Sequence, residues 1–332
     1  VSSRTIPSSR FCGFGACRDH ETKSFECGKC ENRCQVNRVK VGGRTAHFGD
    51  VCERYTSRDR AVASTGSDAR ERPFPELFEA RATLLDEHLP QPRSQRRPRV
   101  GLVRASLSSP YLPFWAALVD DLGFEPVLAP RTARGTEWGG KGLPPEVCLP
   151  LKIAHDQVHQ LLEREGVDRV LLPAVLEIDK RQQRDRPHTC LYAQQLPDMA
   201  KLTFGEGLLA PQLAMSANEG LQREAVRALA DALGAPARRV RKAWRRAWQR
   251  QAAFENACRR LGDEALANLT GDAVLVLGKP YNLHDPDANL GLARTLDRLG
   301  LVAVPMDLLP LDDAPLGEEW YMLPWQLSRD QV

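Results

Sequence analysis

The sequence predicts an α/β protein with two Rossmann-like or flavodoxin-like parallel-sheet lobes, preceded by a small cysteine-rich β-hairpin module. Three observations predict this class. Short apolar segments typical of buried strands alternate with amphipathic helical patterns over residues 99–270. The same alternation resumes from residue 271. Four cysteines gather within a short polar segment ahead of both regions.

These patterns divide the chain into four parts. We expect a cysteine-rich metal-binding module over 1–58, a helical and Pro/Arg-rich linker over 59–98, a first α/β lobe over 99–270 and the start of a second lobe over 271–332. The sequence starts without Met, so we expect it to be an internal piece of a longer polypeptide.

The composition limits the classes of protein that fit. With 332 residues, of which 42% are hydrophobic, the chain can bury a core. It has no apolar run of 18 residues and no export signal, so we expect a cytoplasmic protein with reduced thiols and no membrane contact. A net charge of +3 gives no general preference for nucleic acid.

The strongest metal signal lies in the cysteine-rich module. Cys27, Cys30 and Cys34 follow a C-x2-C-x3-C spacing, and Cys52 can complete a set of four thiols. Between Cys34 and Cys52, residues 35–41 and 44–48 are expected to pair as strands around the Gly-Gly turn at 42–43. Spacing alone suits zinc and an iron-sulfur cluster equally well.

The first lobe is predicted from a β-α-β unit and the segments that follow it. Gly123 ends the first helix, and Gly166 and Gly234 end later ones. The expected strands are 100–103, 126–128, 169–172 and 201–204, and the expected helices are 113–122, 149–165, 218–233 and 236–266.

The last of these helices carries seven basic residues between Arg238 and Arg250, together with Trp244 and Trp248. A nucleic-acid surface is one interpretation, since cations and aromatic rings both bind nucleic acids. We favour an amphipathic helix that packs its tryptophans inward and solvates its arginines, because no recognition fold surrounds it. For the second lobe we expect a strand over 273–277, a helix over 287–299 and a strand over 301–304.

Candidate site residues follow the strands, because open parallel sheets bind ligands at the carboxyl ends of their strands. Cys148 precedes a helix that has Pro150 in its first turn, where unpaired N–H groups favour a thiolate. Cys190 precedes a second helical segment, which Pro197 is expected to shorten or kink. Each cysteine alone is more often a small buried residue, but together they predict a shared site. Cys258, inside the long helix, is expected to serve packing.

A third loop follows the first strand of the second lobe. Much of it is ordinary turn chemistry, with Asp285 or Asp287 as an N-cap. Its remaining polar and aromatic residues are candidates to line the cleft: Lys279, Tyr281, Asn282 and His284. No Walker loop, complete G-x-G-x-x-G after a strand or G-x-S-x-G occurs in the sequence.

Several of these segments, in order, resemble one family. They include Val100-Gly-Leu-Val-Arg-Ala, Glu146-Val-Cys-Leu-Pro-Leu-Lys-Ile-Ala-His155, His188-Thr-Cys and Leu277-Gly-Lys-Pro-Tyr-Asn. Over roughly residues 99 to 310 the chain resembles the acyl-CoA dehydratase activase-related (CoA enzyme activase) proteins, relatives of 2-hydroxyacyl-CoA dehydratase subunits and double-cubane cluster proteins. The Cys27–Cys52 region resembles the segment that joins this domain to an ATP-binding activator domain.

The resemblance implies a low-potential iron-sulfur cluster, of the 4Fe-4S or double-cubane type, held by cysteines between two lobes. Cys148 and Cys190 match two such positions. It also implies a partner activator, in a separate subunit or fused, that hydrolyses ATP to drive electrons into the cluster. The chain departs from the family pattern in two ways: it lacks the activator's ATP-binding motifs, and no third cysteine after Cys190 fits a ligand position. A complete cluster therefore needs residues outside this chain, or the site is degenerate.

Two functions follow as hypotheses. The first is an iron-sulfur component of an ATP-dependent electron-transfer system, part of a reductase or dehydratase, that acts on an acyl-CoA or another small molecule. The second is a noncatalytic scaffold whose zinc knuckle at the module cysteines docks an activator ATPase. Nucleic-acid binding through the basic helix is the least favoured interpretation.

Overall fold

The computed structural model describes most of the region from residue 76 onward and part of the N-terminal module. The described residues are 20–28, 33–41, 44–50, 55, 76–91, 96–130, 142–144, 147–178, 188–216, 219–285 and 288–309. The chain divides into two compact units, residues 1–71 and residues 72–332. Each unit is described by itself.

The N-terminal unit contains a three-stranded antiparallel sheet in the order β1-β2-β3. The predicted hairpin is confirmed, as β2 (Gln35–Val41) pairs with β3 (Arg44–Phe48). A further strand, β1 (His20–Glu26), pairs with the other edge of β2 and was not predicted. Six of its seven residues are exposed, so it lacks the apolar alternation by which a strand is detected in a sequence.

The second unit is built on parallel sheets, which confirms the predicted α/β class. Its main sheet has the order β5-β4-β6-β8, and all of its pairings are parallel. A second parallel pair joins β7 and β9. The strands are β4 (Arg99–Leu102), β5 (Glu125–Leu128), β6 (Arg169–Leu171), β7 (Ala174–Ile178), β8 (Leu208–Leu209) and β9 (Gln212–Met215).

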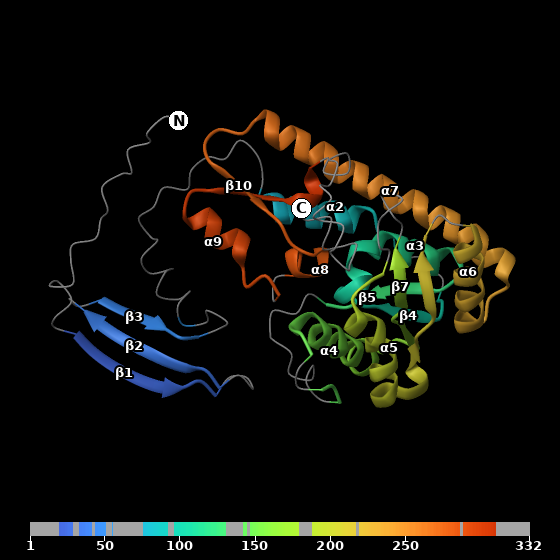
Figure 1. Ribbon diagram of the computed structural model, residues 1–332, viewed down its shortest axis with the longest axis horizontal. Coiled ribbons are helices and arrows are strands. Elements are labelled where there is room, and N and C mark those ends of the chain that lie inside the picture. The colour runs from blue at the N-terminus through green and yellow to red at the C-terminus, as the bar shows by residue number, and fades with distance from the viewer. Residues whose placement is uncertain are drawn as a thin grey trace. The chain divides into compact units, whose positions relative to one another are not determined.

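Helices cover both faces of the main sheet (Figure 1). Val100 and Leu102 of β4 belong to one hydrophobic core, whereas Val103, directly after the strand, belongs to a second core, because successive residues of an extended segment point to opposite faces. The first core takes side chains from α3 (Leu112–Asp121), α6 (Glu219–Leu233) and α7 (Ala237–Ala267). The second core takes them from α4 (Leu149–Glu163) and α5 (Leu191–Phe204), and the 3₁₀ helices η2 (Ser106–Tyr111) and η3 (Gly205–Gly207) complete this lobe.

One predicted strand is wrong. Residues 201–204 form the last turn of α5. This helix is 14 residues long and continues through Pro197. Ala193, Leu196, Pro197 and Ala200 are all buried and share one helical face. Burial of this face, with Ala193 in the first core and Leu196 and Ala200 in the second, therefore outweighs the cost of proline in a helix interior.

The long helix α7 packs its tryptophans inward, as the amphipathic interpretation predicted. The Trp244 side chain is fully buried, and its ring meets that of Phe114 at 4.9 Å and 84°. Trp248 is half-buried, with its ring centroid 5.0 Å from that of Phe114. The basic side chains lie on the exposed face: Arg238, Arg239, Arg241, Lys242, Arg245, Arg246 and Arg250.

The second lobe contains a parallel two-stranded sheet of β10 (Ala273–Val276) and β11 (Val302–Pro305). Around it lie α8 (Pro280–Leu283), α9 (Leu292–Arg298) and η4 (Met306–Leu308). The helix predicted over 287–299 is shorter than expected and begins after Gly291. The linker helix α2 (Leu77–Glu87) packs with α7 and η4 in a third hydrophobic core.

Candidate functional site

The two candidate cysteines both stand at helix starts. Cys148 is the N-cap of α4 and Cys190 is the N-cap of α5. Both have extended backbones, and neither side chain caps its helix, so each thiol lies at a terminus with uncapped N–H groups. Cys148 is exposed and Cys190 is half-buried. The helix termini favour negatively charged groups at both positions.

Cys190 is fixed by the residue before it. Thr189 is buried; its N–H donates to the Leu176 carbonyl at 3.0 Å and its hydroxyl donates to the Val175 carbonyl at 2.5 Å. Gln194, one turn into α5, donates from Nε2 to the Thr189 carbonyl at 3.0 Å. These bonds attach the start of α5 to β7 and so hold the position of Cys190 against the sheet.

Tyr281, in α8 of the second lobe, packs in the same hydrophobic core as Cys190. It is buried in the first core, against which Cys190 also packs. Helix α8 packs on η2, and α4, which begins after Cys148, packs on η2 as well. Burial raises the pKa of Tyr281, and negative charge on Cys190 and Cys148 raises it further. Tyr281 and Cys190 therefore pack in one hydrophobic core, and the helices that carry Tyr281 and follow Cys148 both contact η2.

The segment between β4 and α3 contributes backbone to this region. Ser106, the first residue of η2, is buried and has a φ of 53°, a left-handed conformation uncommon for serine. Such conformations concentrate at functional sites, where the surrounding structure holds them in place. The two-cysteine site, defined here as Cys148, Cys190 and Tyr281, therefore borders a backbone turn under strain.

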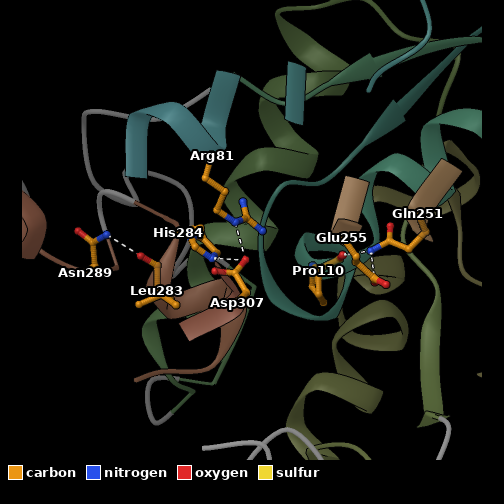
Figure 2. Close-up of polar contacts among 8 residues, drawn as sticks. All are labelled: Arg81, Pro110, Gln251, Glu255, Leu283, His284, Asn289 and Asp307. Atoms are coloured by element: carbon orange, nitrogen blue, oxygen red, sulfur yellow. Dashed lines mark hydrogen bonds and ion pairs between the residues drawn. The ribbon is translucent and has the colours of Figure 1, made fainter. Parts of the chain in front are cut away.

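The other residues predicted from the α8 loop lie differently. Lys279 is the N-cap of α8, and its carbonyl accepts hydrogen bonds from the N–H groups of Asn282 and Leu283. The Asn282 side chain belongs to an exposed residue. His284 turns to Asp307 instead, with its Nε2 3.0 Å from the Asp307 Oδ2 (Figure 2). Of the four loop residues, Tyr281 is the one whose pKa responds to the cysteines.

His284 belongs to a polar triad with Arg81 and Asp307, in which the Arg81 and His284 side chains are only 9% and 10% exposed and that of Asp307 is 30% exposed. Arg81 Nε donates to Asp307 Oδ2 at 2.5 Å, and the guanidinium lies 5.1 Å from the centre of the Phe254 ring. Burial would raise the pKa of Asp307, but the charge of Arg81 and the contacts with His284 hold it far below its usual value. Burial, aided by the charge of Arg81, lowers the pKa of His284. A neutral His284 therefore donates its Nε2 proton to an ionised Asp307.

The sequence contains a pattern that indicates a buried position for Arg81. Leu77, Arg81 and Leu85 recur at a spacing of four and are the three buried residues of α2. An arginine on the apolar face of a helix requires a buried acidic partner, because an unpaired charge is too costly to bury. Asp307 follows β11 directly in η4, but no local pattern connects it with a residue 226 positions earlier.

In the N-terminal unit the structure brings two module cysteines together. The Cys27 N–H donates to the Cys34 carbonyl at 2.9 Å, and Cys27 is buried. Cys30 and Cys52 lie outside the described residues. The rings of Phe25, His47 and Tyr55 pack on the same sheet with centroids 5.3–6.4 Å apart.

Neither cysteine group has a third metal donor among the described residues. No three His, Cys, Asp or Glu side chains there converge on a point where an ion would fit. Among the described residues, each group contains two cysteines. Cys258, by contrast, is buried within α7, and burial raises the pKa of its thiol to about 12, so it stays protonated and serves packing.

Comparison with known proteins identifies the family. Over the helices that the structure describes, none combines the length and apolar character needed to cross a bilayer. No curated protein and no solved structure matches the chain. A family model, the CoA enzyme activase uncharacterised domain, matches residues 99–309, which is more than half of the chain and includes Cys148, Cys190 and Tyr281. The chain therefore belongs to the CoA enzyme activase uncharacterised domain family.

Proposed function

We propose that the protein is an iron-sulfur component of an ATP-dependent, low-potential electron-transfer system, with Cys148 and Cys190 binding the cluster. The observation that supports this proposal is that two cysteines of one parallel-sheet lobe both stand at helix starts whose N–H groups have no side-chain cap. Both cysteines follow strands of a parallel-sheet lobe, which is where such folds bind ligands.

The donor chemistry fits an iron-sulfur cluster. Such clusters are held by cysteine thiolates, and helix N-termini stabilise negative charge on sulfur. When bound, the cluster would accept and release single electrons. The two cysteines supply two ligands, and further ligands would come from outside the described residues, as a partner protein or another segment of the polypeptide.

The partner and the substrate follow from the family. The family name is consistent with an activator partner. The resemblance described above implies that this activator hydrolyses ATP and donates electrons, and we propose an acyl-CoA or another small molecule as the acceptor. The exposed apolar residues next to the cysteines support the contact of a partner or substrate with this surface. They are Leu149, Leu191 and Tyr192, with 42%, 68% and 58% of their surfaces exposed.

Anaerobic purification with iron, sulfide and zinc analysis, followed by electron paramagnetic resonance, tests the proposal. The double variant Cys148→Ala/Cys190→Ala should lose one cluster signal. Cys258→Ala is the matched control, because this thiol is buried in α7 and should leave every signal unchanged. Zinc without iron or sulfide, before and after reconstitution, would refute the redox function.

A second candidate function is a noncatalytic scaffold in which the N-terminal unit docks an activator. The backbone bond between Cys27 and Cys34 favours it, because it sets two thiols at adjacent strand ends as in a metal knuckle. Cys27, Cys30, Cys34 and Cys52 would bind zinc, or a cluster that relays electrons. Cys27→Ser/Cys34→Ser should remove that metal and leave the Cys148 and Cys190 signal; joint loss of both would contradict two separate sites.

A further inference from the structure

The N-terminal part of α7 exposes charges of a single sign. The helix runs along the outside of the second unit (Figure 1). No acidic residue occurs between Ala237 and Phe254, and the basic side chains of this stretch are all exposed. We call them the basic face: Arg238, Arg239, Arg241, Lys242, Arg245, Arg246 and Arg250. From the first of them to the last, the helix rises by about 18 Å.

Two of these cations contact the C-terminal end of α3. Arg246 forms an ion pair with Asp121 at 3.6 Å, and Arg239 donates to the Leu122 carbonyl at 3.3 Å. Within the part of the chain that the structure describes, the other five form no ion pair and no hydrogen bond: Arg238, Arg241, Lys242, Arg245 and Arg250. Their charged groups are therefore available to a partner.

This arrangement of charges is unfavourable for the helix itself. Cations stand four residues apart along it, as Arg238 and Lys242 do, and like charges at this spacing destabilise a helix. The dipole at a helix N-terminus favours acidic side chains, but α7 has neither an acidic residue in its first turn nor a side-chain N-cap. A cost of this kind, with no compensating contact in the chain, is expected at a functional surface.

The basic face lacks the features of nucleic-acid and membrane surfaces. Proteins that bind single strands place exposed aromatic rings beside their cations, but Trp244 is fully buried and Trp248 packs on Phe114. A basic amphipathic helix binds a membrane through its apolar face, which α7 buries in the first core. The net charge of the chain is only +3, so its other residues are negative in sum and would repel a long polyanion.

We propose that the basic face of α7 docks an acidic surface of a partner protein. Aspartate and glutamate side chains of the partner would pair with the five available cations, four of which are arginines that can bind a carboxylate through two parallel hydrogen bonds. Opposite charges on the two surfaces also speed their encounter and fix their orientation. The inference does not depend on the proposed function, because it involves neither Cys148 nor Cys190.

A labelled oligo-glutamate peptide is the probe, and fluorescence anisotropy measures its binding to the full chain. The variant Arg238→Gln/Lys242→Gln/Arg245→Gln should bind it about tenfold more weakly, as for three lost ion pairs at an exposed surface. The matched control removes the same charge from three exposed residues outside α7 and should bind within about twofold of the wild type. This control is Arg164→Gln/Arg169→Gln/Lys201→Gln.

Two results of this experiment would overturn the proposal. One is the absence of peptide binding by the wild type at near-physiological ionic strength, and the other is an equal loss of affinity in the two triple variants. A labelled DNA duplex gives a third criterion. It should bind the wild type more weakly than the peptide does, and tighter binding that is lost in the α7 variant would assign the basic face to nucleic acid instead.

Thermal unfolding tests whether the basic face is kept at a cost in stability. At low ionic strength the α7 variant should unfold roughly 2–4 °C above the wild type, because it removes repulsion between like charges. The control variant should show no such rise. An unfolding temperature of the α7 variant below that of the wild type would show that the cations stabilise the fold, which would refute their retention for a partner.

Discussion

Arg81 and Asp307 lie 226 positions apart in the sequence, yet their side chains form an ion pair of 2.5 Å. The pair joins helix α2, which precedes the first lobe, to η4 in the second lobe. His284 shares the same carboxylate oxygen. The triad is therefore a tertiary contact that connects three segments, and its removal has measurable consequences.

Asp307→Asn should lower the free energy of unfolding by about 3 kcal/mol, because it leaves the buried Arg81 charge without its partner. Urea titration followed by circular dichroism measures the change. Asp272→Asn serves as control, since Asp272 is an exposed carboxylate in the same lobe and should change stability by less than about 0.5 kcal/mol. Equal effects of the two substitutions would contradict the structural role of the triad.

Stability should fall as the pH is lowered from 7 towards 5. Burial and Arg81 lower the folded-state pKa of His284 below its usual 6.5, so the unfolded chain takes up a proton that the folded chain resists. The stability supplied by neutral His284 is thus present above about pH 6.5 and is lost below it. The carboxylate of Asp307, whose pKa is also lowered, loses its contribution only below its usual 3.8.

His284→Gln isolates this effect, because glutamine donates a hydrogen bond but does not titrate. The difference in unfolding free energy between pH 7 and pH 5 should be smaller in the variant than in the wild type. The other groups facing His284 are Arg81 and Asp307, and neither changes charge in this range. An unchanged pH dependence would show that His284 is not the responsible group.

Gly262→Ala should destabilise the protein by about 1–3 kcal/mol through overpacking. A Cβ at this position of α7 would lie 1.9 Å from the Leu308 carbonyl oxygen, so α7 and η4 would have to separate. This outweighs the gain of about 1 kcal/mol for alanine in a helix. Gly278→Ala is the control, since its nearest contact would be 3.7 Å from Leu283. Thermal unfolding distinguishes the two variants.

Trp244→Ala should cost about 3–5 kcal/mol, since the ring is fully buried against Phe114. Arg245→Ala, its exposed neighbour, should change stability by less than about 0.5 kcal/mol. Guanidinium titrations of both variants measure the contrast. A similar loss for Arg245 would mean that the basic face is part of the packing.

Much of the fold was predictable because its elements show strong local patterns. The strand at Val100 and the helix at Phe114 have clear apolar spacing, and glycines end the helices that follow. The error at residues 201–204 arose because Pro197 was expected to limit a helix that tertiary packing extends. β7 was missed because its apolar residues follow β6 after only Leu172 and Pro173.

The cysteines of the candidate site could be predicted from the sequence, but most of the residues around them could not. Cys148 and Cys190 could be chosen as candidates because each directly precedes a helix. Tyr281 was a candidate among four loop residues, and only the three-dimensional arrangement distinguishes it from Asn282 and His284. The partnership of Arg81 with Asp307 could not be predicted, because it depends on how the second lobe packs against α2.

The length of helix α7 and its packing at both ends restrict how the two lobes can move. Its 31 residues span about 46 Å, and its buried residues belong to the first core at Trp244 and to the third core at Ala265. Such a rod anchored at both ends resists a hinge between the lobes, as Leu308 would have to slide over Gly262 for the lobes to rotate. The separation of the two lobes would then stay fixed, and a partner would have to fit the surface as this separation sets it.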